Sequence, residues 1–140
     1  MALFVLDTDH ITLLQHGHPQ IAERFIATPE SDVAASIVTY EEQLRGRLAV
    51  IRQSKSPARL AVAYLRLREM QDFFCAIRLL DFDAKAVSIY ETLRQTHRGL
   101  GAMDLRIAAT TLAAGGILVT RNTRDFASIN DLSLVDWSAS

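Results

Sequence analysis

Short, continuous apolar runs alternate along this chain with longer stretches in which apolar residues recur at helical spacing. The runs at residues 2–6 and 117–120 are typical of strands buried on both faces of a parallel sheet. Weaker runs predict strands at 32–36, 80–82 and 133–135. The helical patterns predict helices at about 10–15, 20–27, 41–53, 57–79, 83–97 and 104–114. This alternation predicts an α/β fold, with residues 1–140 as a single domain and a central parallel sheet flanked by helices.

Two aspartates mark the edges of the best-defined helix–strand unit. Asp104 opens the predicted helix, the pair Gly115-Gly116 supplies its left-handed stop, and Asp125 follows the next strand in a polar turn. Asp7 repeats this arrangement at the carboxyl end of the first strand. Because ligands bind outside the carboxyl ends of parallel strands, these acids predict a site at that edge of the sheet. Taken singly, Asp104 and Asp7 also suit a structural role as helix caps.

Two adjacent glutamates, Glu41 and Glu42, follow Thr39 after the predicted strand 32–36. Thr39 and Glu42 match the capping-box pattern, in which the threonine caps a helix and the glutamate reaches back to it. Alternatively, Glu42 projects from the first turn of this helix into a site. The local sequence by itself favours the cap.

The composition is that of an ordered globular protein, with 49% hydrophobic residues and a formal net charge of −1. The apolar runs are too short to cross a bilayer, and the first one ends at Asp7 without a basic leader. We therefore expect a cytoplasmic protein with no membrane partner. The single cysteine, Cys75, lies in an apolar run and is expected to be a buried small hydrophobe.

Positive charge is concentrated in residues 45–68, which contain seven Arg or Lys residues and no Asp or Glu. The breaker before Pro57 divides this region into two helices, which predicts a helical hairpin arm. Such a stretch is either a surface that follows phosphates, with Arg59 and Arg66 as candidate contacts, or a solvated and ion-paired helical face.

Four stretches around these residues resemble the motif regions of PIN-domain ribonucleases, in particular the VapC toxins of toxin–antitoxin modules. They are LDTD at 6–9, TYEEQLRG at 39–46, DLRIAAT at 104–110 and VTRNTRDF at 119–126. The resemblance implies a PIN-like fold and an acidic quartet supported by Thr8 and Asn122. The quartet would consist of Asp7, Glu42, Asp104 and Asp125. Position 9 departs from the pattern, since it is Asp where the family commonly has Asn. The spacing from Thr39 and the presence of Gly46 favour Glu42 over Glu41.

The implied activity is cleavage of RNA phosphodiester bonds with Mg²⁺ or Mn²⁺, which prefer oxygen ligands. Asp7, Asp104 and Asp125 would be primary ligands, with Glu42 binding directly or through water. Nearby arginines are candidate phosphate contacts, although a structural salt bridge explains each equally well. They are Arg98, Arg121 and Arg124. The resemblance also implies a cognate antitoxin as partner and a homodimer.

Two other functions compete with this interpretation. Asp7-Thr8-Asp9 after a strand resembles the nucleophile motif of aspartyl phosphotransferases or phosphatases, with Asp7 attacking and Asp9 as acid–base. A PIN fold that holds RNA or a protein without catalysis is the second alternative. The four histidines, among them the isolated His10, show no metal-binding spacing with cysteine.

Overall fold

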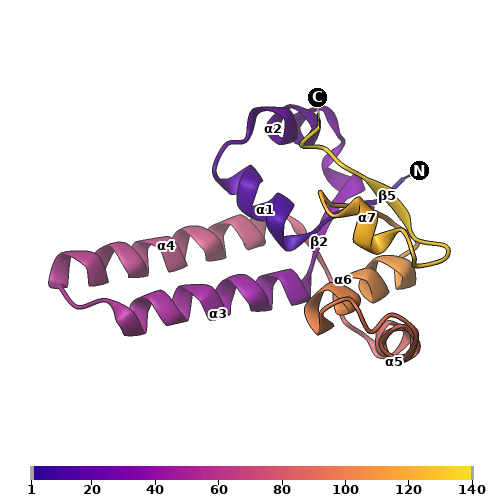
Figure 1. The fold of residues 1–140 in the computed structure, drawn as a ribbon. Helices are drawn as coiled ribbons and strands as arrows, with labels where there is room; N and C mark the ends of the chain where they lie inside the picture. The colour runs from indigo at the N-terminus through magenta and orange to yellow at the C-terminus, as the bar shows by residue number, and fades with distance from the viewer. Residues whose placement is uncertain (1, 140) are drawn as a thin grey trace.

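The computed structural model describes residues 2–139 and contains one five-stranded sheet in which every pairing is parallel (Figure 1). The strand order is β3-β2-β1-β4-β5. The strands are β1 (Phe4–Leu6), β2 (Val33–Ser36), β3 (Arg78–Leu80), β4 (Ile117–Val119) and β5 (Ser133–Val135). In the register, Leu6 lies opposite Ala35 on one side and Val119 on the other. The predicted α/β architecture with a parallel sheet is therefore confirmed.

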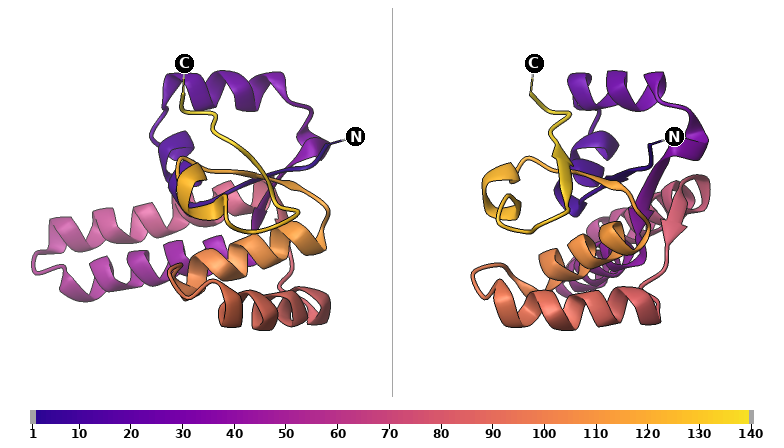
Figure 2. Two further views of the ribbon diagram at one scale, coloured as in Figure 1. Left: turned by 45° about the vertical axis from the view of Figure 1, so that its right-hand side comes forward. Right: turned by 90° about the vertical axis from the view of Figure 1, so that its right-hand side faces the viewer.

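Helices cover both faces of the sheet, as the two views in Figure 2 show. Leu6 and Val119 point to one face and pack with α1, α2 and α4, whereas Leu118 points to the other and packs with α5, α6 and α7. This alternation explains why the strands are apolar throughout. The helices are α1 (Thr8–Gln15), α2 (Pro19–Ala27), the short 3-10 turn η1 (Glu30–Asp32), α3 (Ile37–Gln53), α4 (Pro57–Ala76), α5 (Ala84–Thr96), α6 (Ala102–Ala113) and α7 (Thr123–Phe126).

Helix α3 begins four residues earlier than its hydrophobic pattern predicts. The Ser36 hydroxyl accepts a hydrogen bond from the Val38 amide, so Ser36 is the N-cap. The capping box expected at Thr39 is therefore wrong, and Thr39 is fully buried inside the first turn of the helix. The apolar residues 37 and 38 concealed this start because they continue the strand pattern.

Helix α4 ends at Ala76, and residues 78–80 form β3, so the predicted strand at 80–82 was placed two residues too late. Pro57 begins this helix behind the N-cap Ser56, as expected. Cys75 is exposed near the end of α4, and the expectation that it is buried is wrong. Cys75 lies about 100° around α4 from the buried Phe74, outside the buried stripe of the helix.

The connection from α6 to β4 depends on two adjacent glycines with different roles. Gly115 has a φ of +68°, a conformation that residues with a side chain rarely adopt. A Cβ atom at Gly116 would lie 3.0 Å from the Leu3 carbonyl oxygen, so the bare backbone allows close packing of the turn against the sheet. The predicted stop of the helix is thus confirmed at Gly115.

Helices α3 and α4 form the predicted hairpin arm, which projects away from the sheet in Figure 1. In residues 2–139, no helix is long and apolar enough to cross a membrane.

Candidate active site

Three of the four predicted acids follow directly from the order of strands at the centre of the sheet. Asp7 comes after β1, and Asp125 lies in α7, which follows the neighbouring β4. Glu42 is in the second turn of α3, which follows β2 on the other side of β1. Asp104 is the third residue of α6. Four carboxylates from distant parts of the chain are thereby brought to one edge of the sheet.

The electrostatics of Asp104 reflect the neighbourhood of the other three acids. Burial raises the pKa of its carboxyl group above the ordinary value, and the negative charges of Glu42, Asp7 and Asp125 raise it further. Asp104 is half-buried and is not the N-cap of α6, since Gly101 occupies that position. The carboxylate of Asp104 therefore remains available to the site.

Asp7 is held by the start of α1. Its side chain caps the helix, with Oδ1 accepting a hydrogen bond of 2.8 Å from the His10 amide. Its own amide donates to the Val119 carbonyl oxygen on β4 at 3.0 Å. The residue is 9% exposed, so both main chain and side chain are fixed at the centre of the sheet edge. Asp7 is therefore the N-cap of α1, and the same carboxylate is the predicted site residue.

Glu42 and Glu41 have different environments. The Thr8 hydroxyl donates to Glu42 Oε1 at 2.6 Å and lies 3.1 Å from Thr39 Oγ1, which links α1 to α3. Glu41 is exposed and pairs with Arg45 at 3.0 Å. Glu42 is therefore the glutamate on the side of the acidic cluster, and Thr8 is the group that orients it.

The donor set matches the chemistry of a hard divalent cation, since four carboxylates offer oxygen ligands only. Within residues 2–139, no three acidic, histidine or cysteine side chains form a ready-made ion cage. The carboxylates whose charges act on Asp104 fit such an ion by ligand type. A small pocket of about 200 Å³ adjoins this cluster and is lined by Asp125, His97, Gly99, Leu100 and Ser128.

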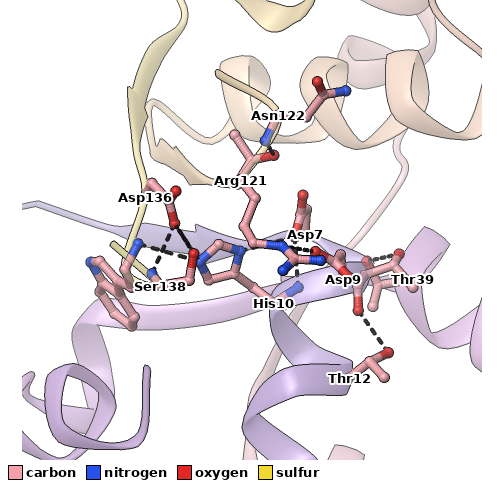
Figure 3. Close-up of polar contacts among 12 residues, drawn as sticks. Asp7, Asp9, His10, Thr12, Thr39, Arg121, Asn122, Asp136 and Ser138 are labelled. Carbon is pink, nitrogen blue, oxygen red and sulfur yellow. Dashed lines mark hydrogen bonds and ion pairs between the residues drawn. The ribbon is translucent and has the colours of Figure 1, made fainter. Parts of the chain in front are cut away.

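The predicted phosphate contacts near the site are exposed. The Arg121 Nε donates to Asp9 Oδ2 at 2.7 Å, which identifies a salt bridge between the loop after β4 and the first turn of α1 (Figure 3). Arg124 lies on α7, and Arg98 lies in the loop between α5 and α6. Asn122 is exposed, and Figure 3 shows its side chain directed away from Asp7.

The arginines of the arm are partly neutralised by acids just outside the basic segment. Arg66 pairs with Glu69 at 2.7 Å, and Arg68 pairs with Asp72 at 3.3 Å. Arg59 lines a groove of about 440 Å³ between α3 and α4 together with Arg66. These positions lie on the projecting arm, and the four acids lie at the sheet edge.

Sequence reasoning missed His10 and the C-terminal residues that enclose it. His10 is completely buried. Its Nδ1 faces Asp7, and its Nε2 faces Asp136 and the Trp137 amide. One local signal was available, because a polar residue three positions after an N-cap faces back toward it. The contact with the C-terminal segment spans 127 residues and leaves no local trace.

A family model described as PIN domain matches residues 4–132 of the chain. The chain is 31% identical to the tRNA(fMet)-specific endonuclease VapC of Shigella flexneri over 99% of this chain and all of that protein. It is 28% identical to ribonuclease VapC1 of Haemophilus influenzae strain R2866, over 97% of this chain and 98% of that one. Among solved structures, a DNA-bound VapBC from Salmonella typhimurium superimposes with a TM-score of 0.77 at 27% identity, covering 98% of this chain and 99% of that chain. The chain therefore belongs to the PIN-domain family, and its relatives include VapC ribonucleases.

Proposed function

We propose that this protein is a metal-dependent endoribonuclease that hydrolyses RNA phosphodiester bonds and acts as the toxin of a toxin–antitoxin pair in the cytoplasm. The observation that carries the proposal is the placement of Asp7, Glu42 and Asp125 after neighbouring strands and close to Asp104. Burial and the negative charges of these three acids both raise the pKa of the Asp104 carboxyl group. Relatives named as VapC ribonucleases support the substrate class.

The four acids are the proposed ligands of Mg²⁺ or Mn²⁺. When bound, such an ion supplies positive charge beside the scissile phosphate and a more acidic water for its hydrolysis. Asp7 offers a pre-oriented carboxylate because α1 and β4 fix it, and Thr8 keeps Glu42 turned toward the cluster. Burial and the negative charges of Glu42, Asp7 and Asp125 raise the pKa of Asp104, and a bound cation would offset the repulsion among these carboxylates.

The test is cleavage of RNA by the purified protein with and without divalent cations. We expect cleavage with Mg²⁺ or Mn²⁺, loss of cleavage after chelation, and recovery when the ion is returned. Cleavage that persists unchanged in a chelator would contradict the proposed dependence. Binding of RNA without any cleavage would favour a non-catalytic binding module.

The aspartyl phosphotransferase alternative has less support. Asp9, its proposed acid–base, is exposed and tied to Arg121. The chain also belongs to the PIN-domain family over residues 4–132, which supports the metal-ligand role proposed for its acids over a nucleophilic one.

The basic arm is the proposed guide for RNA. Replacing Arg59 with Ala should weaken RNA binding and reduce the steepness of its salt dependence, because one fewer counterion is released on binding. Replacing Arg66 should have a smaller effect on the slope, since Glu69 already neutralises it. Binding measured at several salt concentrations tests this order. Equal slopes for wild type and Arg59→Ala would assign that residue to another role.

The arm is also the proposed contact surface for protein partners. Six of the large hydrophobic side chains that are exposed in residues 2–139 lie on α3 and α4; they are Leu48, Val50, Leu60, Val62, Tyr64 and Leu65. An apolar surface of this kind favours association. We therefore propose a homodimer and a cognate antitoxin as partners. Light scattering of the isolated chain at tens of micromolar should give twice the mass of 15.6 kDa, and a monomer mass would contradict the dimer.

A further inference from the structure

His10 lies between the acidic site and the C-terminal segment, and it is fully buried. Its Nδ1 is 3.4 Å from Asp7 Oδ1, and its Nε2 is 3.4 Å from Asp136 Oδ1. Figure 3 shows the ring between these two carboxylates. Burying an imidazole nitrogen without a hydrogen-bond partner costs free energy. The contacts of both ring nitrogens of His10 therefore indicate what this residue does.

The Trp137 amide determines which ring nitrogen carries the proton. This N–H donates to His10 Nε2 at 3.3 Å, so Nε2 presents its lone pair. Asp136 Oδ1 does not depend on a proton from the ring, since it accepts from the Ser138 amide at 2.8 Å and from the Ser138 hydroxyl at 2.6 Å. With Nε2 as the acceptor, a neutral ring carries its proton on Nδ1, the nitrogen that faces Asp7.

His10 Nδ1 is buried and has no hydrogen bond of normal geometry among residues 2–139, although Asp7 Oδ1 is only 3.4 Å away. The same oxygen already accepts from the His10 amide. A small rotation of the Asp7 carboxylate would complete the Nδ1–H contact. Both donors from His10 then act on Oδ1, and Oδ2 is the oxygen left for a ligand.

The Nε2 side of the His10 ring contacts a rigid part of the structure. Trp137 is buried and packs against Phe4 of β1, with ring centroids 5.4 Å apart. Its amide is thereby fixed relative to the strand that precedes Asp7. The segment that follows β5 thus sets the position and the tautomer of His10 from behind the site.

We infer that His10 is a positioning residue for Asp7, in which the Nδ1–H tautomer set by the Trp137 amide fixes Asp7 Oδ1 and directs Oδ2 toward a divalent cation. This inference rests on the proposed metal-dependent function. Groups that hydrogen-bond to a metal ligand typically contribute about 10- to 100-fold to metal affinity.

Two substitutions separate the two ring nitrogens. His10→Asn places an amide N–H near the position of Nδ1, and His10→Gln places its amide near the position of Nε2. Both remove the buried ring, and Asn leaves the larger gap because its side chain is one methylene shorter than that of Gln. The melting temperature of each variant is therefore measured beside its Mn²⁺ affinity. Mn²⁺ affinity is measured without RNA by the loss of the free-ion electron paramagnetic resonance signal.

We expect His10→Gln to bind Mn²⁺ about 10- to 100-fold more weakly than wild type, and His10→Asn to recover most of that loss. Equal Mn²⁺ affinity of wild type and His10→Gln would overturn the inference, as would equal losses in both variants. A wild-type protein that cleaves RNA but binds no Mn²⁺ would instead contradict the proposed metal dependence.

The tautomer is tested separately in the wild-type protein without added metal. This measurement does not require that either variant folds. Nitrogen-15 spectra that correlate the ring nitrogens with the carbon-bound protons should show a protonated Nδ1 and an unprotonated Nε2 at neutral pH. A proton on Nε2, alone or together with Nδ1, would overturn the inference.

Discussion

Asp104→Asn should reduce RNA cleavage by at least about 100-fold while making the metal-free protein more resistant to heat. Cleavage falls because a neutral amide is a poor ligand for a hard divalent cation. Thermal stability rises because the substitution removes a half-buried charge that Glu42, Asp7 and Asp125 repel. The attraction of one carboxylate to the start of α6 is worth about 0.3–1 kcal/mol and opposes this gain. Burial and three like charges outweigh it, as the direction of the Asp104 pKa shift indicates.

The stability difference should depend on pH in a defined direction. Folding raises the pKa of Asp104 above its ordinary value of 3.8, so the folded state holds the proton more tightly than the unfolded state. As pH rises from that value through the raised folded pKa, the wild type loses stability that the Asn variant keeps. The gap in melting temperature should therefore open over this interval and stay constant above it.

Melting curves with and without Mg²⁺, together with initial rates of RNA cleavage, provide the measurement. Glu41→Gln is the matched control, because it also removes one negative charge but its side chain pairs with Arg45 away from the cluster. It should leave cleavage and melting temperature nearly unchanged. Wild-type rates in Asp104→Asn at saturating Mg²⁺ would remove Asp104 from the proposed ligands.

The positions of the acids could be predicted because strand ends are visible in the sequence. The buried strands β1 and β4 appear as apolar runs, and the first acid after each run falls at the carboxyl edge of the sheet. Asp7 and Asp125 were identified by this simple rule. Nothing local revealed whether Asp104 caps α6 or stays free, because that depends on where the helix begins.

Partners from distant segments were not predictable from local patterns. Thr39 and Glu42 satisfy a capping box in sequence, yet the Ser36 cap moves the helix start and the Thr8 hydroxyl becomes the partner of Glu42. Asp9 and Arg121 meet across 112 residues of chain. Such contacts depend on which strands become neighbours, and the local patterns of a sequence do not reveal that order.

The same logic applies to the exposed face of the arm. Helical periodicity correctly predicted that the arm consists of two long helices. A stretch rich in leucine and alanine, however, does not by itself define which side of the helix is buried. In the structure, Ala63 and Met70 face inward on α4, whereas Leu65 remains exposed. The balance between core and surface on such a helix is settled by the neighbour it packs against, here α3.

Asp7→Asn and Asp9→Asn should differ by at least about 100-fold in RNA cleavage, although each substitution removes one charge and adds no bulk. The structure explains why the fold should survive both. Asparagine is as good an N-cap as aspartate, so α1 keeps its start when Asp7 is replaced. Asp9 contributes an exposed salt bridge to Arg121, and pairs of this kind are worth about 0–1 kcal/mol.

Asp7→Asn should lose nearly all cleavage, because the amide weakens a proposed ligand at the centre of the cluster. Asp9→Asn should stay within about threefold of wild type, since breaking an exposed pair changes little and leaves Arg121 free to contact phosphate. An aspartyl phosphotransferase would behave differently. There Asp9 would be the general acid–base, and its loss would cost about 100-fold or more.

Rates of RNA cleavage and of phosphomonoester hydrolysis, measured for both variants beside wild type, distinguish these cases. Melting temperatures close to wild type establish that each variant is folded. Arg121→Ala breaks the same salt bridge from its other end, so it separates loss of the pair from loss of the Asp9 carboxylate. Equal large losses at positions 7 and 9, with a covalent phosphoenzyme in the wild type, would replace the nuclease mechanism with nucleophilic attack by Asp7. A loss confined to Asp7 fits a ligand that α1, β4 and His10 hold at the edge of the sheet.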